Sequence, residues 1–210
     1  MHKLIAIVGI NSTGKTTIAN RVFSYFHEDF ESCIIRESHL LMYLLGIINS
    51  YKETHIGIEE YEQLEKTDQS IIQPLLQTEL PKLIKEIKEQ EELVLYVTHL
   101  AFAFFTEEFE ISMIKNNTFL TEVRNEIDGY IKLTAKPEDI LQRRLKNSDA
   151  KYIDQYKSIE HIVTHQKKSD QIWKDLEIDK LSSVEIDNSD INKNTAPIKA
   201  IDFISEILSK

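Results

Sequence analysis

The fold of this chain is decided by residues 4–16, which read LIAIVGINSTGKT. Residues 4–8 form a continuous apolar run, typical of a parallel strand that is buried on both faces of a sheet. Residues 9–16 match the pattern G-x-x-x-x-G-K-[ST]. Apolar residues then recur at helical spacing, which predicts a helix over 15–27. The pattern therefore stands between a buried strand and a helix, which is the setting that this motif requires.

The residue types in this turn are those of a phosphate-binding loop. Gly9 and Gly14 allow a tight turn whose backbone N–H groups point inward, and the next helix directs its positive end to the same point. We expect Lys15 to reach the β- and γ-phosphate oxygens, Thr16 to coordinate Mg²⁺, and Thr17 to hydrogen-bond the α-phosphate. The predicted nucleotide-binding residues of the loop are Gly9, Asn11, Ser12, Thr13, Gly14, Lys15, Thr16 and Thr17. ATP and Mg²⁺ are the expected cofactors.

The rest of the chain alternates between short apolar runs and segments of helical periodicity. Strands are predicted at 4–8, 33–35, 93–97, 130–133 and 184–186. Helices are predicted at 15–27, at 59–89, before residue 127, from residue 137, around 159–176 and at 197–208. Pro74 and Pro81 each remove a helical hydrogen bond, so 59–89 is expected to be kinked or to form two helices. This alternation predicts an α/β fold with a five-stranded parallel sheet in a single domain over 1–210.

Composition narrows the class of protein. The 210 residues include 35 acidic and 25 basic ones, for a net charge of −10. Nucleic acid is therefore disfavoured as the main partner, because phosphate binding normally needs a basic excess. Apolar runs such as 100–105 are far shorter than the roughly 20 residues that span a bilayer. One cysteine, Cys33, excludes an internal disulfide and predicts a buried, inert thiol in a reducing compartment. We expect a cytoplasmic protein without a membrane partner, and a homodimer is compatible with the sequence.

The additional sequence motifs that mark other classes of phosphate-binding-loop protein are absent from this sequence. A GTPase carries D-x-x-G and [NT]-K-x-D, but the nearest candidates, residues 126–129 and 167–170, match neither. ATPases of the RecA and AAA+ types need an apolar strand that ends in Asp or Asp-Glu, which this sequence does not have.

Two further segments carry a resemblance to a known family. Residues 130–144, YIKLTAKPEDILQRR, resemble the segment of P-loop nucleoside and nucleotide kinases in which the fourth strand enters the helix before the lid. In adenylate, thymidylate and cytidylate kinases, a Pro-Glu pair there precedes an arginine over the nucleotide. Residues 186–189, IDNS, resemble the family's last strand and its loop near the adenine. The resemblance implies a three-layer nucleotide-kinase fold, with a helical acceptor-binding segment at about 40–90 and a short lid at about 143–155.

The resemblance also implies catalytic residues. Arg143 takes the place of the family's first arginine, which stabilises the transferring phosphoryl group, and Arg144 is the second nucleotide-binding arginine. Their alternative is a solvated helix surface. Glu37 ends the second strand, where deoxynucleoside kinases have a glutamate that takes the proton of the attacking hydroxyl. Its alternative is a solvated strand end paired with Arg36. The chain departs from the family at residues 97–99, Val-Thr-His, where the family has an acidic residue near Mg²⁺.

A histidine pair and a cluster of phenylalanines have weaker functional interpretations. His161 and His165 have the spacing of a metal-binding pair on a helix, but the glutamate of the zincin pattern is missing, which favours a solvent-facing pair. Phe102, Phe104 and Phe105 have the chemistry to stack on a base, although aromatics in an apolar run more often belong to the core.

These features lead to one main hypothesis and two alternatives. The main hypothesis is an ATP-dependent phosphotransferase that moves the γ-phosphate of MgATP to a small nucleotide, nucleoside or metabolite, with Lys15, Glu37 and Arg143 as catalytic residues. The first alternative is an ATP-binding regulatory or scaffold protein, suggested by the missing acidic residue at 97–99. The second is an ATPase that acts on a macromolecule.

Overall fold

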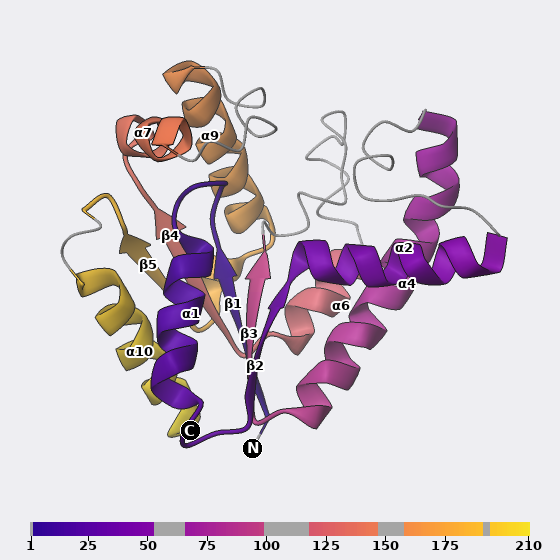
Figure 1. Ribbon diagram of the computed structural model, residues 1–210, viewed down its shortest axis with the longest axis horizontal. Helices are drawn as coiled ribbons and strands as arrows, with labels where there is room; N and C mark the ends of the chain where they lie inside the picture. The colour runs from indigo at the N-terminus through magenta and orange to yellow at the C-terminus, as the bar shows by residue number, and fades with distance from the viewer. Residues whose placement is uncertain (1, 53–65, 99–117, 147–157, 191–193) are drawn as a thin grey trace.

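A computed structural model describes residues 2–52, 66–98, 118–146, 158–190 and 194–210 (Figure 1). Its centre is a five-stranded parallel sheet in the order β2-β3-β1-β4-β5. The strands are β1 Lys3–Val8, β2 Ser32–Arg36, β3 Leu93–Thr98, β4 Gly129–Thr134 and β5 Ser183–Asp187. All five lie within two residues of the predicted strands, so the predicted fold class is confirmed.

The helices cover both faces of this sheet. They are α1 Lys15–Phe26, α2 Glu37–Lys52, α4 Lys66–Gln90, α6 Thr118–Glu126, α7 Pro137–Lys146, α9 Ile159–Asp175, the 3₁₀ turn η3 Ile178–Lys180, and α10 Thr195–Leu208. Among the described helices, none combines the length and apolar character that a membrane crossing needs.

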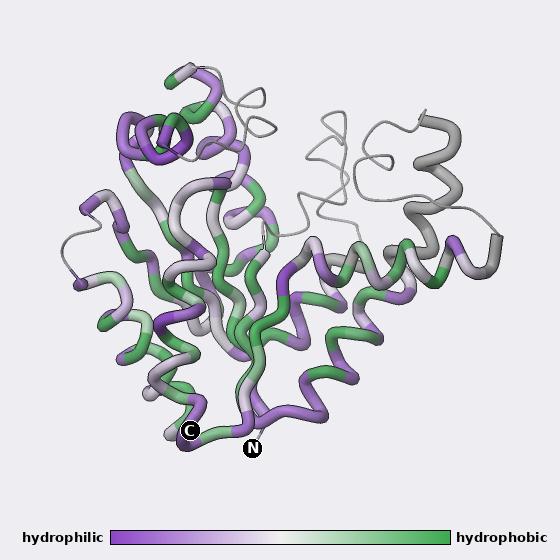
Figure 2. Tube along the Cα trace, in the orientation of Figure 1, coloured by the Kyte–Doolittle hydropathy of each residue, from purple (hydrophilic) through white to green (hydrophobic). Residues whose placement is uncertain are grey.

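Alternate residues of β1 face two separate cores. Ile5 and Ile7 pack with residues of α1 and α10 on one side of the sheet. Leu4, Ala6 and Val8 pack with residues of α2, α4 and α9 on the other. Every one of these strand residues is fully buried, as expected of a central parallel strand. Figure 1 shows α1 and α10 side by side, and Figure 2 shows the hydrophobic residues concentrated along the strands between the helices. The result is the three-layer arrangement that the sequence predicts.

Two helical segments differ from the prediction. A single helix, α4, includes both Pro74 and Pro81, so of the two predicted alternatives, a kink or two helices, the second is wrong. Leu80 and Ile84, which flank Pro81, are fully buried in the core, and this packing offsets a lost hydrogen bond. The second difference is α2, for which the sequence pattern predicts no separate helix, although the helical segment at about 40–90 implied by the resemblance includes most of it. Residues 37–52 are apolar on several sides, so they lack the clear periodicity that marks an amphipathic helix.

A buried lysine connects α9 to the sheet. The Lys132 ammonium on β4 lies 2.7 Å from Asp170 Oδ1 and 3.0 Å from Glu185 Oε2, and 5.4 Å from the centre of the Trp173 ring. Burial opposes the charge of Lys132, but the hydrogen bonds and charges of the two carboxylates raise its pKa above the ordinary value. Because a raised lysine pKa stabilises the fold below the unfolded pKa, this contribution is complete at neutral pH and is lost in strongly alkaline solution.

We expect Lys132→Met to lower the free energy of unfolding by about 1–2 kcal/mol, less than for a fully buried pair because both carboxylates are half-exposed. Urea unfolding at pH 7 measures the change. The control is Lys180→Met, which removes the exposed pair with Glu177 and should leave the free energy of unfolding close to that of the wild type. Equal effects of the two variants would contradict the role of burial.

Candidate nucleotide-binding site

The predicted phosphate-binding loop is a tight turn between β1 and α1. Ser12 and Gly14 have φ angles of 65° and 96°, in the left-handed region. Thr13 is buried, and its Oγ1 donates to the Ile10 carbonyl oxygen at 2.9 Å. This hydrogen bond closes the turn from inside and helps to fix the shape of the loop. Residues 9–14 thus have the compact geometry that a nest of backbone amides requires.

Lys15 is folded back over the loop. Its ammonium donates to the Gly9 carbonyl oxygen at 2.6 Å and to the Ile10 carbonyl oxygen at 3.1 Å, and the residue is 7% exposed. A buried charge needs such partners, because its desolvation would otherwise be costly. The geometry therefore places the Lys15 ammonium group beside the first two residues of the loop.

Residues from the far end of the chain hold the outer side of the loop. The Asn188 side chain, 6% exposed, donates from Nδ2 to the Thr13 carbonyl oxygen at 2.8 Å. Arg143 on α7 donates to the Ser12 carbonyl oxygen at 3.2 Å, and it also donates to the carbonyl oxygens of Asn188 and Ser189, the latter at 3.0 Å. The loop is thereby connected to both α7 and the segment after β5.

We expect Gly14→Ala to reduce nucleotide affinity by at least tenfold and to lower stability by about 1–3 kcal/mol. A Cβ atom at Gly14 would overlap Asn188 Nδ2, and the φ of 96° strains any residue with a side chain. Calorimetric titration with ADP and urea unfolding measure the two effects. Gly46→Ala is the matched control, since an added Cβ there meets no atom within 4 Å. A Gly14→Ala variant that binds ADP like the wild type would contradict the argument.

The carboxyl ends of three strands meet beside this loop. The β3 residue Thr98 pairs with Val8, directly before the loop, and Val97 pairs with Arg36 on the other side. Glu37 is the next residue, and it begins α2. Adjacent strands lie about 4.8 Å apart, so the end of β2 is roughly 10 Å from the end of β1. Thr98 is buried and ends the strand that lies between β1 and β2.

The other predicted site residues lie around the same loop. Thr16 and Thr17 are exposed in the first turn of α1, and Asn11 is half-buried in the loop. Arg144 is 6% exposed and Arg143 is half-buried, so neither arginine lies on a solvated helix surface. The nucleotide-binding roles that the resemblance implies for Arg143 and Arg144 are compatible with these positions.

Several predictions involve residues away from the loop or outside the described part. His99, Phe102, Phe104, Phe105 and most of the expected lid at 143–155 lie outside the described residues. His161 is exposed but His165 is half-buried, so the predicted solvent-facing pair is confirmed for His161 only. The described residues contain no group of three or more residues suited to a metal site.

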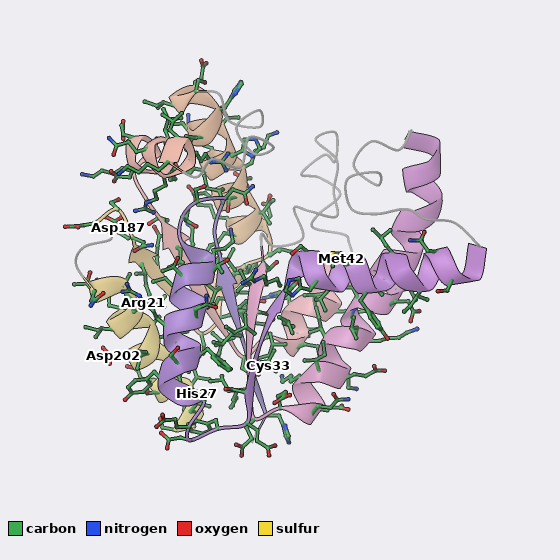
Figure 3. The ribbon with its side chains drawn as sticks, in the orientation of Figure 1. Arg21, His27, Cys33, Met42, Asp187 and Asp202 are labelled. Atoms are coloured by element: carbon green, nitrogen blue, oxygen red, sulfur yellow. The ribbon has the colours of Figure 1, made fainter. Side chains whose placement is uncertain are left out.

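Cys33 is half-buried on β2 (Figure 3) rather than fully buried. Burial, with a smaller effect of Glu91, raises the pKa of its thiol to about 11. The thiol is therefore protonated at neutral pH, in agreement with the predicted inertness.

Asn188 is a site residue that the sequence analysis missed. It was visible only as part of the segment 186–189, whose Asp187 ends β5 (Figure 3). Hydrogen bonds from the Ser189 hydroxyl and backbone N–H lower the pKa of Asp187, so its carboxylate stays charged and holds this turn. No sequence pattern indicates that the next residue, Asn188, contacts a loop 175 positions earlier.

Comparison with solved structures agrees with this geometry. No protein-family model and no curated protein matches the chain. Among solved structures, a shikimate kinase from Bacteroides thetaiotaomicron matches with a TM-score of 0.56 and 12% sequence identity, over 100% of both chains. At 12% identity, this similarity supports a conclusion about the fold alone. The chain therefore has a P-loop kinase-like fold.

Proposed function

We propose that the protein is an ATP-dependent phosphotransferase that moves the γ-phosphate of MgATP to a hydroxyl group of a small acceptor. The observation that carries the proposal is the closed loop of residues 9–14 with the Lys15 ammonium over it, in a kinase-like fold. The loop amides and the α1 N-terminus favour a polyphosphate at this point. Lys15 would exchange its carbonyl partners for β- and γ-phosphate oxygens.

Thr16 is the residue proposed to hold Mg²⁺. Its side chain is exposed in the first turn of α1, and a hydroxyl oxygen is a ligand that Mg²⁺ accepts together with waters and phosphate oxygens. When bound, Mg²⁺ would neutralise negative charge on the β- and γ-phosphates. The described residues near Thr16 thus fit this ion in a site completed by the nucleotide.

Glu37 is the proposed base for the acceptor. It directly follows β2, and β3 lies between β2 and β1, which leads into the phosphate-binding loop. In open α/β sheets, ligands bind at the carboxyl ends of the strands, which favours this edge of the sheet for the acceptor. In the proposed step, an acceptor oxygen forms a bond to the γ-phosphorus while the bond to the β–γ bridging oxygen breaks. ADP leaves with that oxygen, and the acceptor proton passes to the Glu37 carboxylate.

Arg143 is the proposed transition-state arginine. Its guanidinium lies 3.2 Å from the Ser12 carbonyl oxygen, so its charge is beside the loop that would hold the phosphates. A fixed positive charge there favours the charge that develops on a transferring phosphoryl group. Arg144 stays a proposed nucleotide-binding residue, on the same helix.

The test is a transfer assay with γ-labelled ATP, Mg²⁺ and a panel of small hydroxyl acceptors, including nucleosides, nucleotides and hydroxy acids. The proposal expects label on at least one acceptor. The rival is an ATP-binding regulatory protein, which the lack of an acidic residue at 97–99 favours. Tight ATP binding with no labelled acceptor would support that rival, and stimulation of hydrolysis by a macromolecule would support an ATPase.

A further inference from the structure

We infer that Asn188 is a positioning residue that turns the Gly14 amide toward the bound polyphosphate, an inference that rests on the proposed function. The starting point is the hydrogen bond from Asn188 Nδ2 to the Thr13 carbonyl oxygen, 2.8 Å long and buried. Burying a side-chain amide costs free energy unless its polar atoms form hydrogen bonds. Loss of the hydrogen bond from Asn188 to the loop carbonyl would therefore leave a buried polar group without a partner.

The effect of this hydrogen bond on Gly14 follows from the geometry of the peptide unit. The Thr13 carbonyl and the Gly14 N–H belong to one planar trans peptide, in which the two groups point in opposite directions. When Asn188 holds the carbonyl outward, toward β5, the N–H of Gly14 must point toward the inside of the loop. Asn188 thus fixes one of the amides that make up the phosphate nest.

The backbone of Asn188 forms hydrogen bonds with two other elements, and its side chain packs against Gly14. Its backbone N–H donates to the Thr134 carbonyl oxygen at 2.8 Å, which continues the pairing of β4 with β5. Its carbonyl oxygen accepts from Arg143, whose guanidinium also contacts the Ser12 carbonyl oxygen. Because Gly14 lies against Asn188 Nδ2, the glycine is required for this contact as well as for its φ angle. These contacts restrict the orientation of the loop amide, which lowers the cost of ordering it when a polyphosphate binds.

The experiment compares Asn188→Ala and Asn188→Asp with the wild type by calorimetric titration of the full chain with tripolyphosphate and Mg²⁺. Asn188→Asp preserves the shape of the side chain but replaces its N–H donor, and it keeps the test available if the alanine variant folds poorly. Asn194→Ala and Asn194→Asp are the matched controls. Asn194 lies on the same connection between β5 and α10, is exposed, and accepts from Arg21.

We expect both Asn188 variants to bind tripolyphosphate about tenfold more weakly while both Asn194 variants bind like the wild type. In the transfer assay, the KM for ATP should rise about tenfold and the KM for the acceptor should stay constant, a split that a general loss of stability would not produce. Folded Asn188 variants with wild-type tripolyphosphate affinity would overturn the inference alone. A wild-type chain that binds no triphosphate would overturn the proposed function, and with it this inference.

Discussion

Replacement of Lys15 by alanine is expected to lower the rate of phosphoryl transfer on the order of 10³-fold. The ammonium lies at the entrance of the loop, 2.6 Å from the Gly9 carbonyl oxygen and almost fully buried. In this shielded place its charge acts on the β- and γ-phosphates more strongly than it would in water. Because charge grows there as the bond to the leaving oxygen breaks, the loss should fall mainly on kcat, with a smaller effect on the KM for ATP.

Three further variants distinguish the effect of the lost charge on the transfer rate from an effect on folding. Lys15→Arg keeps the charge but not the compact head group, so we expect it to recover only part of the rate. Lys15→Met keeps an apolar stem in the loop and should be as slow as alanine. Lys199→Ala, on the exposed surface of α10, is the matched control and should transfer like the wild type. Steady-state kinetics, with circular dichroism to verify folding, make the comparison. A Lys15→Met variant with normal kcat would exclude phosphate contact by this lysine.

The fold could be read from the sequence because its signals are local. Residues 4–8 are apolar without interruption, and the glycines of the next turn fit φ angles that other residues avoid. Pro137 followed by Glu138 and Asp139 has the chemistry of a helix start, and α7 begins at that proline. Each of these signals depends on neighbours within a few positions along the chain, so no knowledge of tertiary contacts was needed.

The parts that sequence reasoning missed depend on distant contacts. Asn188 meets Thr13 across most of the chain, and nothing near Asn188 in sequence indicates that partner. The continuous helix through Pro81 is stabilised by burial of Leu80 and Ile84 in a core assembled from other elements. The Arg143 contacts belong to the same class, because they depend on α7 and the β5 segment meeting at the loop. The helix or strand propensity of a residue carries no information about such contacts.

Replacement of Glu37 by glutamine is expected to lower kcat by about 10²–10⁴-fold while the affinity for ATP stays within twofold of the wild type. This expectation rests on the position of Glu37 in the sheet. Glu37 follows the last residue of β2, and the register of β2, β3 and β1 separates it from the phosphate-binding loop by one strand. Glutamine keeps the size of the side chain but cannot take a proton, so the acceptor hydroxyl would still bind and would react slowly.

The control for Glu37 is Glu31→Gln, an exposed glutamate before the other end of β2, where the loop is a full strand length away. ATP titration and single-turnover transfer separate binding from chemistry. If both glutamine variants transfer at the wild-type rate, the hydroxyl proton leaves by another route, and the base must be sought outside β2. If Glu37→Gln loses ATP affinity along with rate, the carboxylate acts on the nucleotide side, because a base that touches only the acceptor has no means of changing how the triphosphate binds.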